Sequence, residues 1–309
     1  MRFVVALVAS WLAVGFFTGL ARRRGWGQPV RRDGLQTHLS KDGTPTMGGV
    51  PFGLVIFIVW FVMVGFPGLS DEKGWAAVIM AFCMGLIGFL DDYAKVRSRM
   101  TGEGSTEGLQ ARLRLPLQIL VAFVYSIVAA RHVWVTNIFW IDVAFYTFIT
   151  VGTVNAVNFT DGIDGQAAGV VAIILLPLAV ASPLAAITIG SLVGYLWYNS
   201  RPASIFMGDA GSYALGGVVA GVYIIHGWSK VLPFAAIIPV LEVLSVMIQV
   251  SVFQYTKRTT GTGRRVFLMT PIHHHFEKAG MSEVKIASRF YVVTALGTAL
   301  AWALRTGAR

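Results

Sequence analysis

Two pairs of acidic residues stand out in a chain that otherwise carries few charges. Asp91 and Asp92 follow the apolar stretch GLIGFL, and Asp161 and Asp164 lie in the stretch NAVNFTDGIDG, residues 155–165. Neighbouring carboxylates suit a divalent cation such as Mg²⁺, which takes oxygen ligands and also binds substrate phosphates. The alternatives are solvated charges at a membrane edge for the first pair and a capped turn for the second, because Asn, Thr, Asp and Gly are common in turns.

Local geometry can be predicted for both pairs. We expect an apolar helix to end at Asp91 and Asp92, where the negative end of the helix dipole makes two acids unfavourable without a cation. If the helix continues, Lys95 lies one turn after Asp91 and could simply form an ion pair with it. Asp161 and Asp164 are three residues apart, so one helical turn would place them on one face.

Two further polar stretches could take part in the same chemistry. Asp209 lies between glycines in FMGDAGS, residues 206–212, and is either a helix cap or a ligand of Mg²⁺. The consecutive His273, His274 and His275 would point in different directions. The surrounding sequence has neither a Cys nor an HExxH pattern, so hydrogen bonds to phosphate oxygens fit these histidines better than zinc does.

Two isolated charges complete the set of candidates. Lys41 precedes TPTMGG, residues 44–49, and could reach a phosphate as a mobile point charge. Glu242 lies near Pro239 in an apolar stretch, where an acid is a functional candidate by default. Alternatively, Glu242 anchors a proline-broken helix by accepting hydrogen bonds from freed backbone amides.

The elements that position these residues are predicted to be membrane-spanning helices. Of the 309 residues, 55% are hydrophobic and 13% are charged, about half the charged fraction of a soluble domain. About ten stretches approach the roughly 20 apolar residues that a span requires. They are residues 3–20, 47–66, 74–90, 115–130, 138–157, 167–182, 184–199, 212–227, 231–253 and 286–304.

The polar stretches between the spans are short, so we expect residues 1–309 to form a single membrane-embedded domain without a soluble one. The lone Cys83 lies in the third span, where it is expected to be a small core residue.

The basic residues predict the orientation of these spans. Of the 25 Lys and Arg residues, 19 lie in the loops after the odd-numbered spans. Since basic loops remain in the cytoplasm, both termini are expected outside. Five polar stretches then fall on the cytoplasmic side, where a lipid headgroup can meet a soluble substrate. They contain Lys41, the pair Asp91 and Asp92, the pair Asp161 and Asp164, Asp209, and the three consecutive histidines. This arrangement favours Mg²⁺-assisted phosphoryl transfer, in which positioning and charge stabilisation supply most of the catalysis.

A different class, the ion-coupled transporter, is the main alternative to an enzyme. Transporter sites usually lie near the membrane midplane between internal repeats. The acids here are predicted at one interface, and the sequence shows no evident repeat, so the enzyme is favoured.

Six of these motifs together resemble a known enzyme family. They are GTPTMGG (43–49), GFLDDYAK (88–95), NAVNFTDGIDG (155–165), FMGDAGS (206–212), SVMIQV (245–250) and TPIHHHFEKAG (270–280). In this order they resemble the phospho-N-acetylmuramoyl-pentapeptide-transferases, a branch of the polyprenyl-phosphate N-acetylhexosamine-1-phosphate transferase superfamily. The triple histidine favours this branch over those that use UDP-GlcNAc, which remain the nearest alternative.

The resemblance implies an activity and its participants. Such enzymes transfer phospho-MurNAc-pentapeptide from UDP-MurNAc-pentapeptide to undecaprenyl phosphate with Mg²⁺, giving lipid I and UMP. This is the first membrane step of peptidoglycan synthesis. It further implies an all-α, ten-span protein of the bacterial cytoplasmic membrane, commonly a homodimer. Its partners are then these substrates and membrane lipid, and no nucleic acid is expected.

The resemblance also implies roles for individual residues. Asp91, Asp92 and Asp209 match the catalytic acids, with Asp209 as the Mg²⁺ ligand. Asn158, Asp161 and Asp164 match residues of the nucleotide site, and Phe206 matches the aromatic residue that stacks on uracil. The further matching substrate-site residues are Lys41, Lys95, Gln249, His273, His274 and His275.

Two departures from the family pattern are visible. Glu107 precedes Gly108-Leu109, where the family usually has a lysine, and Arg112 or Arg114 could replace the lost phosphate contact. The stretch TKRTTGTGRR, residues 256–265, is longer than usual and could alter a loop that covers the substrate.

Overall fold

The computed structural model describes residues 1–27, 43–66, 71–101 and 111–307, without the side chains of 99, 100, 111 and 112. Within these residues the protein is all-helical, and the extended backbone forms only an isolated bridge between Gly27 and Pro45. The α-helices are α1 (Arg2–Arg24), α2 (Gly49–Trp60), α3 (Glu72–Thr101), α4 (Ala111–His132), α5 (Phe139–Thr160), α6 (Gln166–Leu175), α7 (Pro183–Asn199), α8 (Gly208–Ile225), α9 (Leu232–Ala235), α10 (Ile237–Thr260), α11 (Ile272–Lys278) and α12 (Glu283–Thr306).

Each of the ten apolar stretches contains a helix, and among the described residues seven helices are long and apolar enough to cross a membrane. These are α1, α3, α4, α5, α8, α10 and α12. The other stretches hold shorter helices: α2 with a π-helical turn at Phe61–Gly65, α6 with a 3₁₀ turn at Leu176–Leu178, and α7. A polytopic membrane protein is therefore supported, and the number of ten spans stays a prediction.

Helix α8 is the most buried of these spans, with 78% of its apolar window inside the protein. It packs along α3 on one side and α5 on another. Small residues permit this closeness, because a Cβ on Gly217 would lie 2.8 Å from Ala81 Cα of α3. On the other side, a Cβ on Gly216 would lie 2.5 Å from Val154 Cα of α5. Such small residues bring helix backbones together in membrane proteins.

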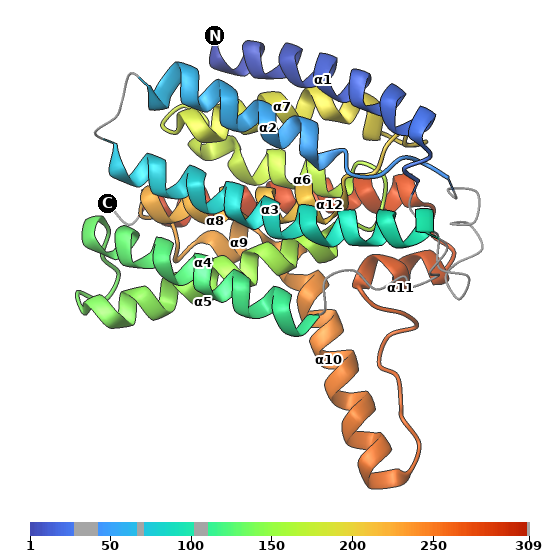
Figure 1. The fold of residues 1–309 in the computed structure, drawn as a ribbon. Coiled ribbons are helices and arrows are strands. Elements are labelled where there is room, and N and C mark those ends of the chain that lie inside the picture. The colour runs from blue at the N-terminus through green and yellow to red at the C-terminus, as the bar shows by residue number, and fades with distance from the viewer. Residues whose placement is uncertain (28–42, 67–70, 102–110, 308–309) are drawn as a thin grey trace.

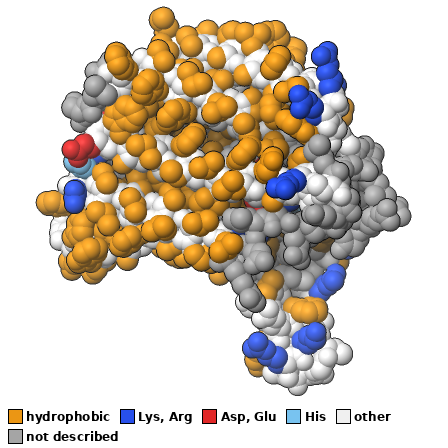
Figure 2. Space-filling model, in the orientation of Figure 1, with side chains coloured by type: hydrophobic (Ala, Val, Ile, Leu, Met, Phe, Trp, Pro, Cys, Tyr) orange, Lys and Arg blue, Asp and Glu red, His pale blue; other side chains and the backbone are white. Residues whose placement is uncertain are grey.

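The two ends of the helix bundle differ in charge and in which segments they hold. The start of α1 and the end of α12 lie at one end, whereas the end of α1 and helix α11 lie at the other (Figure 1). Blue Lys and Arg side chains gather mainly at the α11 end and on the projecting α10, while apolar side chains cover the visible flank of the bundle (Figure 2). The last turn of α1 is basic and consists of Arg22, Arg23 and Arg24.

Helix α10 starts inside the bundle and then projects away from it, and residues 261–271 run back to α11 (Figure 1). We refer to residues 246–271 as the arm. The side-chain oxygen of Gln249 accepts hydrogen bonds from the backbone N–H groups of Val266 (2.9 Å) and Phe267 (3.0 Å). Gln249 therefore joins the two limbs of the arm, and the basic stretch 256–265 forms its tip.

Candidate active site

Three carboxylates from two helices meet at the α11 end of the bundle. Asp91 and Asp92 come from α3 and Asp209 from α8, and one oxygen of each lies within 4.8 Å of the others. Asp91 and Asp92 are buried, and Asp209 is partly buried. The prediction that Asp91 and Asp92 end a helix is wrong, because α3 continues to Thr101. The acids therefore repel one another without the added effect of a helix C-terminus.

Two basic side chains compensate this negative charge. Lys95 Nζ lies 2.6 Å from Asp91 Oδ2, as the helical spacing predicted, and also 2.9 Å from Asp209 Oδ2. Arg114 of α4 adds weaker ion pairs to the same two oxygens, at 3.4 and 3.6 Å. These cations bridge the acids of α3 and α8 and would be available to an incoming phosphate.

The backbone and neighbouring amides fix the acids in place. The Ala210 N–H donates to Asp92 Oδ2 (3.0 Å), so the first turn of α8 holds an acid of α3. Gly88 makes this possible, because any Cβ there would overlap with the main-chain oxygen of Asp209. Asn158 Nδ2, at the end of α5, donates to Asp209 Oδ1 (2.8 Å) and lies 2.9 Å from Ser212 Oγ. Sequence reasoning missed Ser212, whose Oγ contacts Asn158 and the main-chain carbonyls of Gly208 and Asp209.

The donor set fits a divalent cation. Three carboxylates supply the oxygen ligands that such ions take. Asp91 Oδ1 is buried and has no hydrogen-bond partner in the part of the chain that the structure describes. A buried carboxylate oxygen without a partner is unfavourable, and a cation would satisfy it. The cluster could therefore hold a metal ion through Asp91, Asp92 and Asp209.

The second acidic pair lies in a turn, which was one of the two interpretations of the sequence, and not on a shared helical face. Helix α5 ends at Thr160 and α6 begins at Gln166. Asp164 Oδ2 accepts a hydrogen bond from the Ala203 N–H (3.2 Å). Gly165 takes a left-handed conformation with φ of 78°, which glycine adopts without strain. The two carboxylates are thus directed by a tight turn rather than by helical periodicity.

Asp161 is linked electrostatically to the acid cluster. Burial, first, and then the negative charges of Asp209, Asp92 and Asp164, in that order, together raise the pKa of Asp161 to about 8. A carboxyl group with this pKa is largely neutral at pH 7 in the metal-free protein. The protonation of Asp161 in the turn 161–165 therefore depends on the charge of the cluster.

Phe206 lies in a loop that pairs with the glycine-rich entry to α2. The Phe206 N–H donates to the Pro45 carbonyl (2.8 Å), and the Gly48 N–H donates to the Phe206 carbonyl (2.8 Å). These bonds hold Phe206, which is half-buried, beside the start of α8. Lys41 and Glu107 lie outside the described residues.

The three histidines point to different partners, as predicted. His273 is buried and its Nδ1 lies 2.9 Å from Glu242 Oε1. His274 Nδ1 lies 2.6 Å from Glu277 Oε2 within α11, and the Leu268 N–H donates to His275 Nδ1 (3.2 Å).

Glu242 has different partners from those expected. It was predicted either to act at a functional site or to bond backbone amides freed by Pro239. Its only main-chain donor among the described residues is His273, 31 residues away, and its side-chain donors are His273 and Gln166. Sequence reasoning also missed Gln166, which carries no signal beyond its place after the DGIDG turn.

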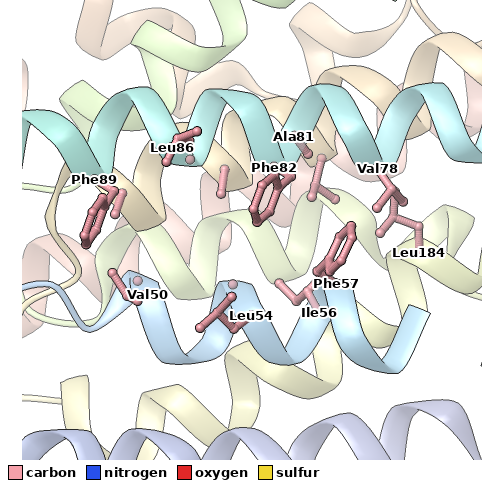
Figure 3. A pocket seen from close by; sticks show the side chains of 16 residues that line it. Val50, Leu54, Ile56, Phe57, Val78, Ala81, Phe82, Leu86, Phe89 and Leu184 are labelled. Atoms are coloured by element: carbon pink, nitrogen blue, oxygen red, sulfur yellow. The ribbon is translucent and has the colours of Figure 1, made fainter. Parts of the chain in front are cut away.

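An apolar cavity adjoins the acid cluster. It has a volume of about 230 Å³ and lies between α2 and α3, with α8 as a third wall (Figure 3). Leu54 and Phe57 of α2 face Phe82 and Phe89 of α3 across it (Figure 3). All sixteen residues that line it are apolar or glycine. One of them, Ala210, is the residue whose N–H holds Asp92, so the apolar space reaches the acids through the first turn of α8.

Residues 74–227, which include all three clustered acids, match the family model of glycosyl transferase family 4. The phospho-N-acetylmuramoyl-pentapeptide-transferase of Deinococcus radiodurans is 45% identical over 316 residues, covering 98% of this chain and 99% of the relative. That of Deinococcus deserti is 47% identical over 310 residues, covering 99% of both chains. That of Synechococcus sp. strain JA-2-3B'a(2-13) is 39% identical over 318 residues, covering 96% of this chain and 88% of the relative.

These relatives match along nearly the whole chain, and the family model spans the helices that bring the acids together. The chain belongs to the phospho-N-acetylmuramoyl-pentapeptide-transferase family within glycosyl transferase family 4, and it is a transferase of the membrane.

Proposed function

We propose that this enzyme transfers phospho-MurNAc-pentapeptide from UDP-MurNAc-pentapeptide to undecaprenyl phosphate, giving undecaprenyl-diphospho-MurNAc-pentapeptide (lipid I) and UMP in peptidoglycan synthesis. The chain would act as a single membrane-embedded domain in the bacterial cytoplasmic membrane. The observation that carries the proposal is the cluster of three acids and two cations at the basic end of a membrane-type helix bundle. Its two substrates both bring phosphates, one from a lipid and one from a nucleotide.

The reaction needs the nucleophile and the leaving group held in line. In the proposed step, an oxygen of the lipid phosphate attacks the β-phosphorus of the UDP-sugar. The bond from that phosphorus to the bridging oxygen breaks, and UMP leaves with the oxygen. Lys95 and Arg114 would bind the phosphates as they approach, because both cations already contact two carboxylate oxygens there. Positioning of this kind is the main source of rate in phosphoryl transfer.

Asp91 would orient the lipid phosphate. Its Oδ2 carries the ion pairs with Lys95 and Arg114, whereas its Oδ1 is the buried oxygen without a partner. A phosphate monoester has its second pKa near about 6 and is mostly dianionic at pH 7, so a general base contributes modestly. Asp92, which accepts a hydrogen bond from the Ala210 N–H, would supply the third carboxylate of the cluster.

Mg²⁺ would be held by Asp209, with Asp91 and Asp92 close enough to share it. When bound, the ion neutralises charge on the pyrophosphate and on the departing UMP. Asn158 would orient Asp209 through its hydrogen bond to Oδ1.

The nucleotide end of the donor would lie at the DGIDG turn and the Phe206 loop. Asp161 and Asp164 would face the nucleoside, and Phe206 would stack on uracil. His273, His274, His275, Lys41 and Gln249 would form the remaining substrate contacts. Two features support this placement: the turn follows the helix that carries Asn158, and Phe206 precedes Asp209 by three residues.

The test is UMP release from purified full-length protein supplied with Mg²⁺, undecaprenyl phosphate and UDP-MurNAc-pentapeptide. We expect UMP in equal amount to lipid I, and none when the lipid phosphate or Mg²⁺ is omitted. Parallel reactions with UDP-GlcNAc should be inactive. Absence of UMP from well-folded enzyme, or faster turnover of UDP-GlcNAc, would overturn the proposal.

A covalent route is the rival mechanism, in which an aspartate takes the phospho-sugar before the lipid arrives. Incubation with the radiolabelled UDP-sugar alone distinguishes the two. Direct attack leaves the protein unlabelled, and a trapped labelled enzyme would refute it. A homodimer, as the family resemblance implies, is tested by the mass of the purified complex.

A further inference from the structure

A buried carboxylate, Glu242 of α10, has no part in the mechanism proposed above. It is fully buried, and its hydrogen bonds come from two distant segments. Gln166 Nε2 donates to Oε1 (3.0 Å), and His273 contacts both oxygens. Removing a carboxylate from water costs several kcal/mol unless partners compensate. Acids at such depth in a membrane protein usually serve a site.

Glu242 holds His273 at two points. Its Oε1 lies 2.9 Å from His273 Nδ1, and its Oε2 accepts the His273 backbone N–H at 3.4 Å. Because a carboxylate only accepts hydrogen bonds, Nδ1 is the protonated ring nitrogen in this pair. The main chain and the ring are thereby fixed together, in the way that a carboxylate sets the tautomer of a metal-bound histidine.

The other ring nitrogen of His273 is directed at the DGIDG turn. His273 Nε2 is buried, and no hydrogen-bond partner for it occurs among the described residues. A methyl group added to Gly162, between the two acids of the turn, would overlap with this nitrogen. His274 and His275 differ, because their Nδ1 atoms are engaged within α11 and the arm. His273 is thus the histidine whose ring faces the turn.

We propose that Glu242 is a positioning residue that acts through His273. It holds the ring so that Nε2, which carries no proton in this tautomer, accepts a hydrogen bond from a hydroxyl group of the sugar nucleotide bound at the DGIDG turn. The inference rests on the proposed function, since it takes this turn to be the nucleotide side of the site. Gln166, the first residue of α6, connects the turn to Glu242. Residues of α6, α10 and α11 therefore fix the position of the His273 ring together.

Binding of UDP-MurNAc-pentapeptide to full-length protein with Mg²⁺ and without lipid phosphate tests the proposal by calorimetry. We expect Glu242→Gln and His273→Ala each to raise the Kd about tenfold. The double variant should bind no more weakly than His273→Ala alone. Ser245→Ala is the matched control, because Ser245 is buried one turn along α10 and its hydroxyl donates to the main-chain carbonyl of Glu242 (2.7 Å), not to its carboxylate. It should leave the Kd unchanged.

Two results would overturn the proposal. One is a Glu242→Gln protein that binds the donor as tightly as the wild type. The other is a further loss when Glu242→Gln is added to His273→Ala, which would show that Glu242 acts by another route. If the wild type binds the donor but releases no UMP with lipid phosphate, the proposed function fails while this inference stands.

A second set of measurements needs no Glu242 variant. Nitrogen NMR of ¹⁵N-histidine protein, with the His273 signals assigned by His273→Ala, should show protonated Nδ1 in the wild type. Gly162→Ala should displace the ring, change these signals and weaken donor binding. In the His273→Ala background Gly162→Ala should have no further effect on the Kd. Unchanged His273 signals in Gly162→Ala, or independent effects of the two substitutions, would refute the geometry.

Discussion

Lys95 and Arg114 are the side chains that allow three carboxylates to share one buried corner. Both lie close to the same oxygens of Asp91 and Asp209, so the negative charge of the cluster is partly neutralised before any ligand arrives. A bound cation and two phosphates would change this balance, and the cluster is therefore the most sensitive point for substitution.

Asp209→Asn should abolish the response to Mg²⁺ and lower kcat by about a thousandfold or more, because metal charge stabilisation is worth several kcal/mol. Mg²⁺ at 100 times its Kd should stabilise the wild type by about 2.7 kcal/mol, seen as a higher Tm. This increase should vanish in the variant.

Asp142→Asn is a matched control for this substitution. Asp142 is also buried, but it binds Val135 and Thr136 beside the start of α5. It should lower Tm without removing the Mg²⁺ response. A normal Mg²⁺ response in Asp209→Asn would argue against the metal site.

Asp161 predicts a pH dependence of stability in the metal-free protein. Its pKa rises from 3.8 in the unfolded chain to about 8 in the folded protein. Between these values only the folded state keeps the proton, so the free energy of unfolding falls as pH rises and levels off above about 8.

Asp161→Asn removes this pH dependence. In EDTA, the Tm of the variant minus that of the wild type should grow from pH 5 to pH 8 and then stay constant. Parallel curves across this range would show that Asp161 is not the responsible group.

Sequence reasoning at this scale succeeded for local contacts and failed for distant ones. The Lys95–Asp91 pair follows from helical spacing, and the divergent histidines follow from their adjacency. The partners of Glu242 were not predicted, because they lie 31 and 76 residues away and no local pattern marks them. Arg114 was considered as a phosphate contact, but its position beside Asp91 depends on how α3 and α4 pack.

At the scale of elements, the site depends on how closely α8 approaches α3 and α5. Asp92 reaches the Ala210 N–H only because glycines let the backbones approach. The prediction that α3 ends at Asp91 and Asp92 failed, because it considered the helix without its neighbours. Asp91 and Asp92 resemble a helix stop, yet Lys95 and Arg114 compensate their charge and the helix continues to Thr101.

Gly217→Ala should separate α8 from α3, because the new methyl group would be too close to Ala81 Cα. Overpacking of this kind costs about 1–3 kcal/mol, so both Tm and kcat should fall.

Gly53→Ala is the control for this change. A Cβ on Gly53 of α2 would meet no atom within 4 Å. It should be neutral or slightly stabilising, since alanine favours helix by up to about 1 kcal/mol over glycine. Equal losses in both variants would show that loss of glycine, rather than helix separation, is responsible.

At the scale of the molecule, hydropathy predicted where helices form because it is a local property of the chain. Each expected span contains a helix. Whether the shorter helices α2, α6 and α7 cross the membrane is not a local property, because it depends on their position in the bilayer. The projection of α10 was not predicted, because apolar length indicates a possible span, which α10 is, but not whether the helix stays within the bundle.

The proposed orientation predicts which residues are reached from outside the cell. In a Cys83→Ala background, Lys230→Cys should react with an impermeant maleimide in intact cells. Lys257→Cys, on the arm, should react only after permeabilisation. Both lysines are exposed in the structure, so accessibility reports sidedness rather than burial. The reverse pattern would invert the topology.

Helix α10 carries both the buried Glu242 and the tip of the arm, so a tilt of α10 about Glu242 would move the two by very different distances. From Glu242 to Thr260 the helix rises by about 1.5 Å per residue, or roughly 27 Å in all. A tilt that carries the tip through several ångströms therefore moves Glu242 by a small fraction of that distance. Such a tilt would displace the basic stretch 256–265 while leaving the Glu242–His273 contact nearly in place. A single helix, α10, thus carries both the exposed basic tip of the arm and the buried carboxylate that holds His273.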